Sequence, residues 1–453
     1  MKEEKIQEVT ESTKMEDSLL AAPRGTRDLL FEDKIQRDQI VAVLKNVFEL
    51  YGFNPWETPA LERWEVLSSK YAGGAEILKE TYKLEDQGGR QLGLRYDLTV
   101  PLCRVIAGDS SMPMPIKRYA IASVWRDGPI KLGRYREFVQ CDVDIVGAKS
   151  GLADAEIISL VCDAFNQLGI DYVVKVNNRK LLEGLLESLG VETKSVESII
   201  LTIDKLAKIG SPGVEKELIE KGFSIPLAKK ITSTFQDFED CNFEQVFAKC
   251  EKLVGKNEKA KQGLTELEEV FDFLASFQKD VSARVIVDAS LARGLAYYTG
   301  SVFEVYAKAS KVTSSIAGGG RYDELIGKFA GRESIPAVGI SFGLDTIVEV
   351  LKLQSGKPAK KTVADIYVIP IKTIPQCITL ASELRSNGIR TALDLMGRSI
   401  SKNLDYASKQ GVKYVAIVGP KEAEQKKLTL RNLETGEEQL LTLSAAVEKI
   451  LSG

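Results

Sequence analysis

The stretch KRYAIASVWRDGPIKLGRYREFVQCDVDIVG, residues 117 to 147, predicts two strands joined by a short polar turn. Segments 117–127 and 136–147 carry the β-branched and aromatic residues that strands favour, and Gly128 and Pro129 stand between them as turn formers. Consecutive strands with so short a connection pair antiparallel. We therefore expect this hairpin to belong to an antiparallel sheet.

The hairpin also carries a local excess of positive charge. Between residues 117 and 137 six basic residues stand against two acidic ones, with Tyr119, Trp125 and Tyr135 between them. The formal net charge of the whole chain is −3, so the molecule as a whole is not a basic nucleic-acid binder. A solvated hairpin is the more common reason for a basic run, so the run alone is weak evidence for phosphate binding.

A helix and an extended segment precede the hairpin. Apolar residues from Ile40 to Tyr51 recur with the i, i+3, i+4, i+7 spacing of an amphipathic helix, and Gly52 stops the run. Pro55 and Pro59 then favour an extended segment at a sheet edge, because proline cannot donate to a strand ladder.

Further elements lie on both sides of the hairpin in the sequence. Residues 80–86 and 91–100 are candidate strands of the same sheet, and residues 152–170 are typical of a helix that ends at Gly169. Helical spacing with dense charge between about 177 and 281 indicates an inserted helical module. Strand-like segments resume after it, so we expect the sheet to be interrupted and then completed.

The C-terminal part has a different pattern. Residues 353–362, LQSGKPAKKT, are typical of a linker. Beyond it strands and helices alternate, which predicts a small α/β domain whose neighbouring strands are mostly parallel.

Composition limits the class of protein. At 453 residues, with 44% hydrophobic and 28% charged residues, the chain is too long for one ordinary core and fits a globular protein of two or three domains. No apolar run has the length of a membrane span, and the N-terminus lacks the apolar core of a signal peptide, so we expect a cytoplasmic protein without membrane contact. The six cysteines have no CxxC spacing, which argues against a zinc site or a disulfide framework.

The chain contains no histidine at all. This absence excludes a Ser-His-Asp triad, a histidine general base and a histidine-ligated metal. Any catalysis must therefore use carboxylates, arginines, lysines, tyrosines or bound ions.

Four stretches together resemble class II aminoacyl-tRNA synthetases, specifically histidyl-tRNA synthetases of the archaeal and eukaryotic type: LRYDLTVP (94–101), VWRDGPIKLGRYREFVQCDVDIVG (124–147), LARGLAYYTGSVFEV (291–305) and AGGGRYDELIG (317–327). Three shorter segments fit the same family: PRGTRDLL (23–30), ETPALE (57–62) and NNRKLL (177–182). The resemblance covers nearly the whole chain from Ala22 onward, in matching order and spacing.

The resemblance implies an α+β fold: an antiparallel sheet flanked by helices, a helical insertion and a C-terminal α/β anticodon-binding domain. It also implies a homodimer, with the amphipathic helix before Gly52 and the segment around Pro59 forming the first class motif at the subunit interface. The expected domain division begins with a charged N-terminal tail at 1–20. The catalytic core follows in two parts, 21–176 with class motifs 1 and 2 and 282–352 with the histidine signatures and motif 3, and the helical insertion at 177–281 lies between them. A linker at 353–362 then leads to the anticodon-binding domain at 363–453.

The activity that the resemblance implies is that of a histidine–tRNA ligase. Its substrates are L-histidine, ATP and histidine tRNA, and Mg²⁺ accompanies ATP without a metal site made by the protein alone. The catalytic arginines are Arg126 and Arg293, which meet the α-phosphate of ATP, and Arg134 faces the distal phosphates. A planar guanidinium suits the negative charge that builds on phosphate during the reaction.

The histidine pocket is also assigned by resemblance. Asp97, Thr99 and Gln140 hold the α-amino group; alone, Asp97 and Thr99 are as readily a turn cap after a strand. Asp144 and Tyr298 hold the imidazole, while Tyr297 and Tyr322 belong to the same pocket. A carboxylate and a hydroxyl together reach both ring nitrogens, so an analogue without the ring N–H leaves these groups unpaired.

Three positions depart from the family pattern. Thr346 replaces the arginine that ends the third class motif, Gly128 stands where an acidic residue is usual, and Ala296 replaces an aspartate. These departures keep a second interpretation open, a non-catalytic synthetase paralogue that senses histidine or tRNA as a regulatory subunit. The retained Arg126 and Arg293 and the C-terminal domain favour the enzyme.

Overall fold

The computed structural model describes residues 19–68, 75–130, 133–238, 241, 243–277, 281–292, 297–331, 334–355 and 360–452. These residues form two compact units. Within the described residues the larger unit holds 19–27 and 40–355, and the smaller holds 28–39 and 360–452. None of the described helices combines the length and the apolar character that crossing a membrane requires.

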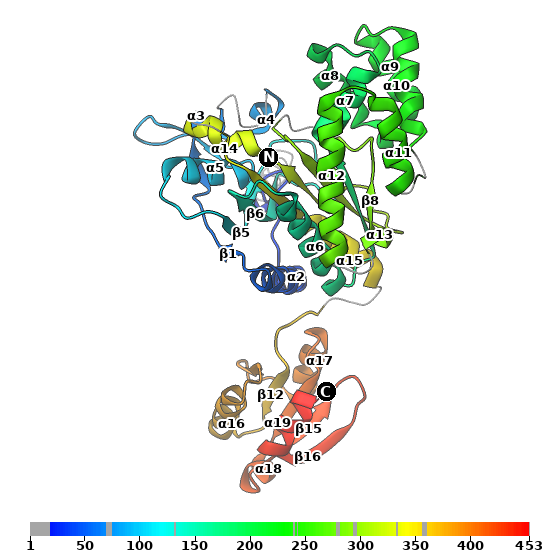
Figure 1. Cartoon of the computed structure of the whole chain (residues 1–453). Helices are drawn as coiled ribbons and strands as arrows, with labels where there is room; N and C mark the ends of the chain where they lie inside the picture. Colours follow the sequence, from blue (N-terminus) through cyan, green and yellow to red (C-terminus); the bar gives the residue numbers. More distant parts are fainter. Residues whose placement is uncertain are drawn as a thin grey trace, which may run out of the picture. The chain divides into compact units, whose positions relative to one another are not determined.

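An eight-stranded sheet forms the centre of the larger unit (Figure 1). Its order is β1-β5-β6-β11-β10-β9-β7-β8, and the strands are β1 (Asn54–Pro55), β5 (Ile116–Trp125), β6 (Glu137–Val146), β7 (Tyr172–Asn178), β8 (Val285–Val287), β9 (Ser301–Ala307), β10 (Ala317–Arg321) and β11 (Ala337–Gly343). Neighbours from β5 to β7 are antiparallel, whereas β1 and β8 pair parallel to their neighbours at the two edges. The sheet is therefore antiparallel, as expected, over its six central strands, with one parallel pair at each edge.

The hairpin of β5 and β6 is confirmed, with an antiparallel register from Ile116 opposite Val146 to Trp125 opposite Glu137. The alternation of residues along β6 gives it two different faces. Cys141, Val143 and Ile145 lie in the main hydrophobic core, and the residues between them point to the other face.

Two further candidate strands do not join this sheet. Segments β2 (Leu61–Arg63), β4 (Gln91–Leu94) and β3 (Lys83–Glu85) form a separate three-stranded antiparallel sheet in that order, next to α3 (Trp64–Leu67) and α4 (Ala75–Glu80). The expected strand at 91–100 ends at Leu94, and α5 (Thr99–Gly108) begins soon after it. The cause is Asp97, whose carboxylate accepts the first free backbone N–H groups of the helix.

Three helices pack on the core face of the large sheet: α2 (Phe31–Leu50), α6 (Gly151–Gln167) and α15 (Leu344–Ser355). Phe48 of α2 and Phe165 of α6 both contact Phe342 of β11, with ring centroids 5.5 Å apart in each pair. The predicted helix before Gly52 is confirmed, although it begins nine residues earlier than Ile40, at Phe31. Gly52, with φ of +76°, takes the left-handed conformation that commonly follows a helix end.

The segment between β7 and β8 is helical, as expected. It contains α7 (Arg179–Ser188), α8 (Thr193–Ile203), α9 (Leu206–Glu220), α10 (Ile225–Gln236), α11 (Phe243–Val254), α12 (Glu258–Phe277) and α13 (Val281–Arg284). The long α12 packs against α6 and α7, so the insertion shares the core of the larger unit (Figure 1).

The smaller unit has a five-stranded sheet in the order β13-β12-β14-β15-β16: β13 (Thr391–Leu393), β12 (Ile366–Pro370), β14 (Tyr414–Val418), β15 (Lys427–Asn432) and β16 (Glu438–Thr442). Its helices are α16 (Ile374–Ser386), α17 (Ile400–Lys409), α18 (Pro420–Glu424) and α19 (Leu443–Ser452). The first three strands are parallel, and the last two pair antiparallel. The expectation of mostly parallel strands was therefore wrong for the second half of this sheet.

Candidate active site

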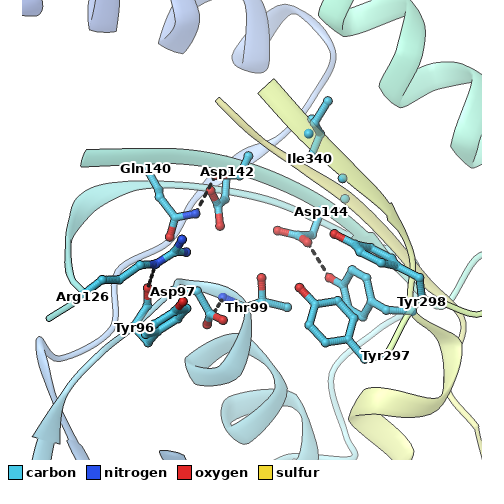
Figure 2. A pocket seen from close by; sticks show the side chains of 15 residues that line it. Tyr96, Asp97, Thr99, Arg126, Gln140, Asp142, Asp144, Tyr297, Tyr298 and Ile340 are labelled. Atoms are coloured by element: carbon cyan, nitrogen blue, oxygen red, sulfur yellow. Dashed lines mark hydrogen bonds between the residues drawn. The ribbon is translucent and has the colours of Figure 1, made fainter. Parts of the chain in front are cut away.

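A cavity of about 220 Å³ lies against the face of β6 that is turned away from α2, α6 and α15 (Figure 2). Side chains and backbone from β6, β10, β11 and the turn before α5 surround it. The lining residues are Tyr96, Asp97, Thr99, Arg126, Gln140, Asp142, Asp144, Tyr297, Tyr298, Gly318, Gly319, Tyr322, Gly339, Ile340 and Ser341.

Strand β6 supplies the polar floor of the cavity through Gln140, Asp142 and Asp144, which alternate along the strand and so share one face. Their register partners are Ala122, Ala120 and Arg118 on β5, and Gly343, Ser341 and Gly339 on β11. Most of these neighbours have small side chains, so space remains above the three polar residues.

Asp144 anchors one end of the floor. Its Oδ2 lies 2.8 Å from Nη2 of Arg118, and its Oδ1 accepts a hydrogen bond from the hydroxyl of Tyr322. Burial raises the pKa of the Asp144 carboxyl, and the charge of Arg118 opposes that shift. Gly339 makes this position possible, because a Cβ atom there would lie only 2.0 Å from Oδ1 of Asp144.

Three tyrosines complete the Asp144 end (Figure 2). The ring centroid of Tyr297 lies 4.8 Å from that of Tyr298 and 6.2 Å from that of Tyr322. Tyr298 packs on Gly320 of β10, where a Cβ atom would come within 2.8 Å of its ring. The glycines of the GGGRY segment thus let aromatic rings approach the sheet backbone.

Arg126 lies at the other end of the cavity. Its Nε donates to the carbonyl oxygen of Tyr96 over 3.2 Å, and its guanidinium carbon is 4.1 Å from the centroid of the Tyr96 ring and 5.0 Å from that of Phe138. The two rings hold the planar cation in one orientation.

Asp97 and Thr99 lie beside Arg126, at the start of α5. Oδ1 of Asp97 accepts from the backbone N–H of Thr99 over 3.1 Å and from that of Val100 over 2.9 Å. The turn-cap interpretation is therefore correct, yet both residues also line the cavity. Burial raises the pKa of the Asp97 carboxyl.

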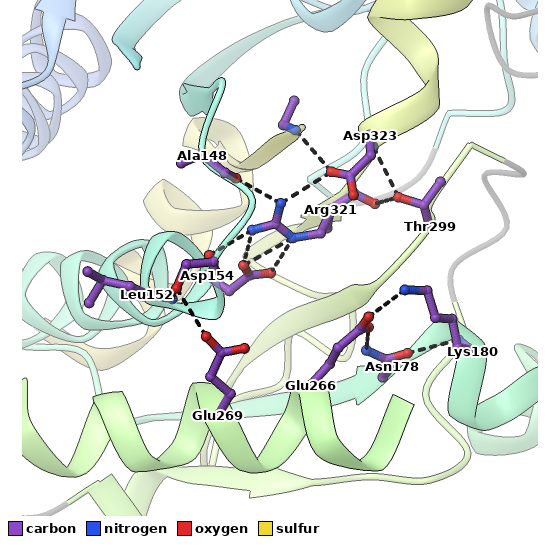
Figure 3. A network of polar contacts seen from close by, with 12 residues as sticks. Ala148, Leu152, Asp154, Asn178, Lys180, Glu266, Glu269, Thr299, Arg321 and Asp323 are labelled. Carbon is purple, nitrogen blue, oxygen red and sulfur yellow. Dashed lines mark hydrogen bonds and ion pairs between the residues drawn. The ribbon is translucent and has the colours of Figure 1, made fainter. Parts of the chain in front are cut away.

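Arg321, at the end of β10, lies at the centre of an ion-pair network with Asp154 and Asp323 (Figure 3). Arg321, which precedes Tyr322, donates through Nε and Nη2 to Asp154 of α6, and through Nη1 to the carbonyl oxygen of Ala148 over 3.0 Å. The Arg321 and Asp154 side chains are only 8% and 1% exposed. The network therefore fixes the end of β10, from which Tyr322 reaches the cavity.

The structure brings most of the expected site residues together. The residues that line the cavity are Asp97, Thr99, Arg126, Gln140, Asp144, Tyr297, Tyr298 and Tyr322. Arg134 does not line the cavity. It is exposed in the turn between β5 and β6. Arg293 and Ala296 lie outside the described residues, so no geometry is given for them.

The structure describes the neighbours of two of the three positions that depart from the family pattern, Gly128 and Thr346. A Cβ atom on Gly128 would lie 3.0 Å from Oε1 of Glu80, so a carboxylate from α4 already lies beside that position. Thr346 is at the start of α15, with its hydroxyl 3.3 Å from a Cβ atom built on Gly343.

Sequence reasoning missed several lining or supporting residues, among them Tyr96, Arg118, Asp142, Gly339 and Ser341. The alternation along β6 was the available signal for Asp142, because it stands midway between two expected ligands. Arg118 had been counted only as one of a basic run, but its side chain is 1% exposed and pairs with Asp144.

No group of three or more acidic or cysteine side chains within the described ranges is arranged to hold a metal ion. The residues that line the cavity present guanidinium, carboxyl, amide, hydroxyl and phenol groups. Such a set suits recognition of a zwitterionic substrate with a polar ring, next to an anionic group at Arg126.

The fold and the pocket define the class: a mixed, largely antiparallel sheet flanked by helices, followed by a separate α/β unit, is the architecture of class II aminoacyl-tRNA synthetases. Residues 25–347 match the family model of histidyl-tRNA synthetase, and residues 365–452 match that of an anticodon binding domain. The chain belongs to the histidyl-tRNA synthetase family.

Individual relatives agree over nearly the full length. Histidine–tRNA ligase 1 of Bacillus cereus is 42% identical over 427 residues, which cover 93% of this chain and 95% of the relative. Histidine–tRNA ligase of Aeropyrum pernix is 41% identical over 434 residues, covering 94% and 97%. The crystal structure of histidyl-tRNA synthetase from Nostoc sp. PCC 7120 has a TM-score of 0.84 and 32% identity, covering 96% of this chain and 99% of that one.

Proposed function

We propose that the cavity is the place where this chain, a histidine–tRNA ligase, joins histidine first to ATP and then to tRNA. One observation carries the proposal: a single cavity has Arg126 at one end and Asp144 with three tyrosines at the other (Figure 2). The first end suits a carboxylate and a phosphate, and the second suits an imidazole ring.

In the first step an oxygen of the histidine carboxylate attacks the α-phosphorus of ATP. The new carboxyl–phosphate bond forms as the bond to pyrophosphate breaks, and pyrophosphate leaves with its electron pair. The carboxylate is already ionised near neutral pH, so no protein base is needed. Arg126 stabilises the charge on the α-phosphate, and its clamp between Tyr96 and Phe138 keeps it oriented for that task.

Two further arginines belong to this proposal on family resemblance. Arg293 meets the α-phosphate together with Arg126, and Arg134 meets the distal phosphates. The exposed position of Arg134 in the turn after Arg126 leaves its side chain able to swing toward a bound nucleotide. Mg²⁺ enters with ATP as its counter-ion.

Asp144 and Tyr298 recognise the imidazole, and Tyr297 and Tyr322 enclose it. The hydrogen bond from Tyr322 and the pairing with Arg118 keep Asp144 in place. Asp97, Thr99 and Gln140 receive the α-amino group. Apolar amino acids of similar size are rejected because they leave buried acceptors unpaired.

In the second step the 3′-terminal ribose hydroxyl of histidine tRNA attacks the acyl carbon, and AMP leaves. Because the chain has no histidine, we assign the proton of that hydroxyl to a phosphate oxygen of the adenylate. The C-terminal unit binds the anticodon, with Arg398, Lys402 and Lys413 as its proposed contacts. Arg398 already lies 4.3 Å from the ring centroid of Tyr406, an arrangement that suits base stacking.

The assembly and type of the enzyme are part of the same proposal. We infer a homodimer formed through the segment around Pro59, a cytoplasmic location, the archaeal and eukaryotic type of the family, and the domain boundaries given above. The 41% identity to the Aeropyrum pernix ligase supports the proposed type, while the Bacillus cereus ligase is equally similar.

The test is amino-acid-dependent exchange of pyrophosphate into ATP, run with the purified chain and each of the twenty amino acids. We expect exchange with histidine alone, and its loss in Arg126→Ala and Arg293→Ala. Arg90→Ala is the matched control, since Arg90 is 79% exposed in a turn outside the cavity and should leave exchange unchanged. A protein that binds histidine but exchanges with no amino acid would instead be the regulatory paralogue.

A further inference from the structure

Two hydrogen-bond acceptors on the cavity floor have no donor within the described part of the chain. They are Oδ1 of Asp142 and Oε1 of Gln140, on neighbouring same-face positions of β6. Asp142 is only 3% exposed and Gln140 9%, and both side chains line the cavity (Figure 2). A buried acceptor without a donor is costly, so the pair indicates a ligand that donates hydrogen bonds.

The neighbouring polar groups contact one another, except that Nε of Arg118 has no hydrogen-bond partner among the described residues. Nε2 of Gln140 donates to the Ser341 hydroxyl over 2.8 Å, which turns its Oε1 toward the cavity. Arg118, the buried cation, pairs with Asp144 and donates to the carbonyl oxygen of Leu98 over 3.1 Å. Among the described residues no lysine or arginine forms an ion pair with Asp142.

The two other carboxylates that line the cavity, Asp97 and Asp144, already accept hydrogen bonds or pair with a cation. Asp97 uses Oδ1 to cap α5, and Asp144 meets both Tyr322 and Arg118. Asp142 has a buried oxygen without a hydrogen-bond donor among the described residues, and it stands between Gln140 and Asp144 on β6. A histidine spanning the Arg126 end and the Asp144 end places its α-ammonium group between its carboxylate and its ring, above Asp142.

We propose that Asp142 is the anionic partner of the α-ammonium group of histidine, with Oε1 of Gln140 as the neutral acceptor beside it. This assignment rests on the proposed function. It adds the identity of the negatively charged side chain that binds the ammonium group. An ammonium group has three N–H donors, so it satisfies both orphan acceptors and leaves one N–H for Asp97 or Thr99. Burial raises the pKa of Asp142 to about 7 although the charge of Arg118 opposes the shift, which agrees with a carboxyl that forms no ion pair of its own among the described residues.

The test compares two ligands that differ only in the amine. Histidinol carries the imidazole and the ammonium group, and imidazolylpropanol lacks the ammonium group. Binding of each to the full-length wild type, Asp142→Asn and Asp144→Asn is measured by competition calorimetry. We expect Asp142→Asn to bind histidinol about 10- to 100-fold more weakly, with imidazolylpropanol changed less than about 2-fold. Asp144→Asn should weaken both ligands alike, because both carry the ring.

Three outcomes overturn the assignment. Equal losses for both ligands in Asp142→Asn would place Asp142 at the imidazole, and no loss for either would remove it from recognition. A wild type that binds neither ligand would reject the proposed function together with the assignment. Asp142→Ser guards against a folding defect: it also removes the charge, and a folded Asp142→Ser with the same selective loss of histidinol supports the proposal.

Discussion

Arg118 and Asp144 form an ion pair of 2.8 Å in which the two side chains are 1% and 4% exposed. The pair joins adjacent strands, β5 and β6, and Asp144 lines one end of the cavity. Arg118 is the cation paired with Asp144, and its charge also acts on the nearby carboxyls of Asp97 and Asp142, so its removal leaves Asp144 as a buried charge without a paired cation.

Arg118→Met should therefore lower the free energy of unfolding by about 3–5 kcal/mol. The double variant Arg118→Met/Asp144→Asn should recover part of this loss, because the uncompensated carboxylate is gone. Urea denaturation of both variants checks the expectation. Equal stabilities for the single and double variants would show that Asp144 does not depend on Arg118.

Gly339→Ala should raise the KM for histidine, because the new Cβ atom would lie 2.0 Å from Oδ1 of Asp144 and must displace it. Gly108→Ala is the matched control, since nothing lies within 4 Å of a Cβ atom at the end of α5. Steady-state exchange kinetics with varied histidine measure both. An unchanged KM in Gly339→Ala would contradict the role of Asp144 at the ring.

Tyr96→Leu should lower kcat/KM for ATP about 3- to 30-fold, because Arg126 loses the ring that lies 4.1 Å from its guanidinium carbon. Tyr96→Phe keeps the ring and loses only the 3.2 Å hydrogen bond to Glu80, so its kinetics should stay close to those of the wild type. If the two variants behave alike, the hydroxyl rather than the ring matters.

The stability of the free protein should depend on pH through Asp142. Burial raises its pKa from 3.8 to about 7 in the folded state. The positive charge of Arg118 opposes this rise, and the negative charges of Asp144 and Asp97 add to it. Between about pH 4 and 7 the unfolded chain releases a proton that the folded chain keeps, so the free energy of unfolding falls as pH rises, by up to roughly 1.4 kcal/mol per unit. Other charged or titratable groups around the cavity are Arg126, Tyr96, Tyr297, Tyr298 and Tyr322.

Asp142→Asn should lack this part of the pH dependence. Urea denaturation of both proteins at about pH 5 and about pH 8 gives the comparison, and the wild type should lose stability relative to the variant on going to the higher pH. Parallel behaviour of the two proteins would mean that Asp142 keeps an ordinary pKa.

The sequence predicts much of this architecture because local patterns determine it. The β5–β6 hairpin follows from its residue types, and the helix before Gly52 from its spacing. The prediction of a strand at 91–100 was wrong beyond Leu94. The carboxylate of Asp97 caps a helix there, although the residues that follow it are typical of a strand.

The floor of the cavity could be predicted only in part. Gln140 and Asp144 were found through family resemblance, whereas Asp142 needed the register of three strands, which places small residues on both sides of it. Arg118 and Asp144 are far apart in sequence, so no local pattern reveals that the arginine of a basic run is buried beneath the site.

The cavity is lined by carboxyl, phenol, amide and guanidinium groups, and the chain contains no imidazole of its own. In a proton NMR spectrum every imidazole C–H resonance of the complex therefore belongs to the bound ligand. The protonation state and tautomer of the bound histidine ring become directly observable in unlabelled protein, provided that the protein is prepared without a polyhistidine tag.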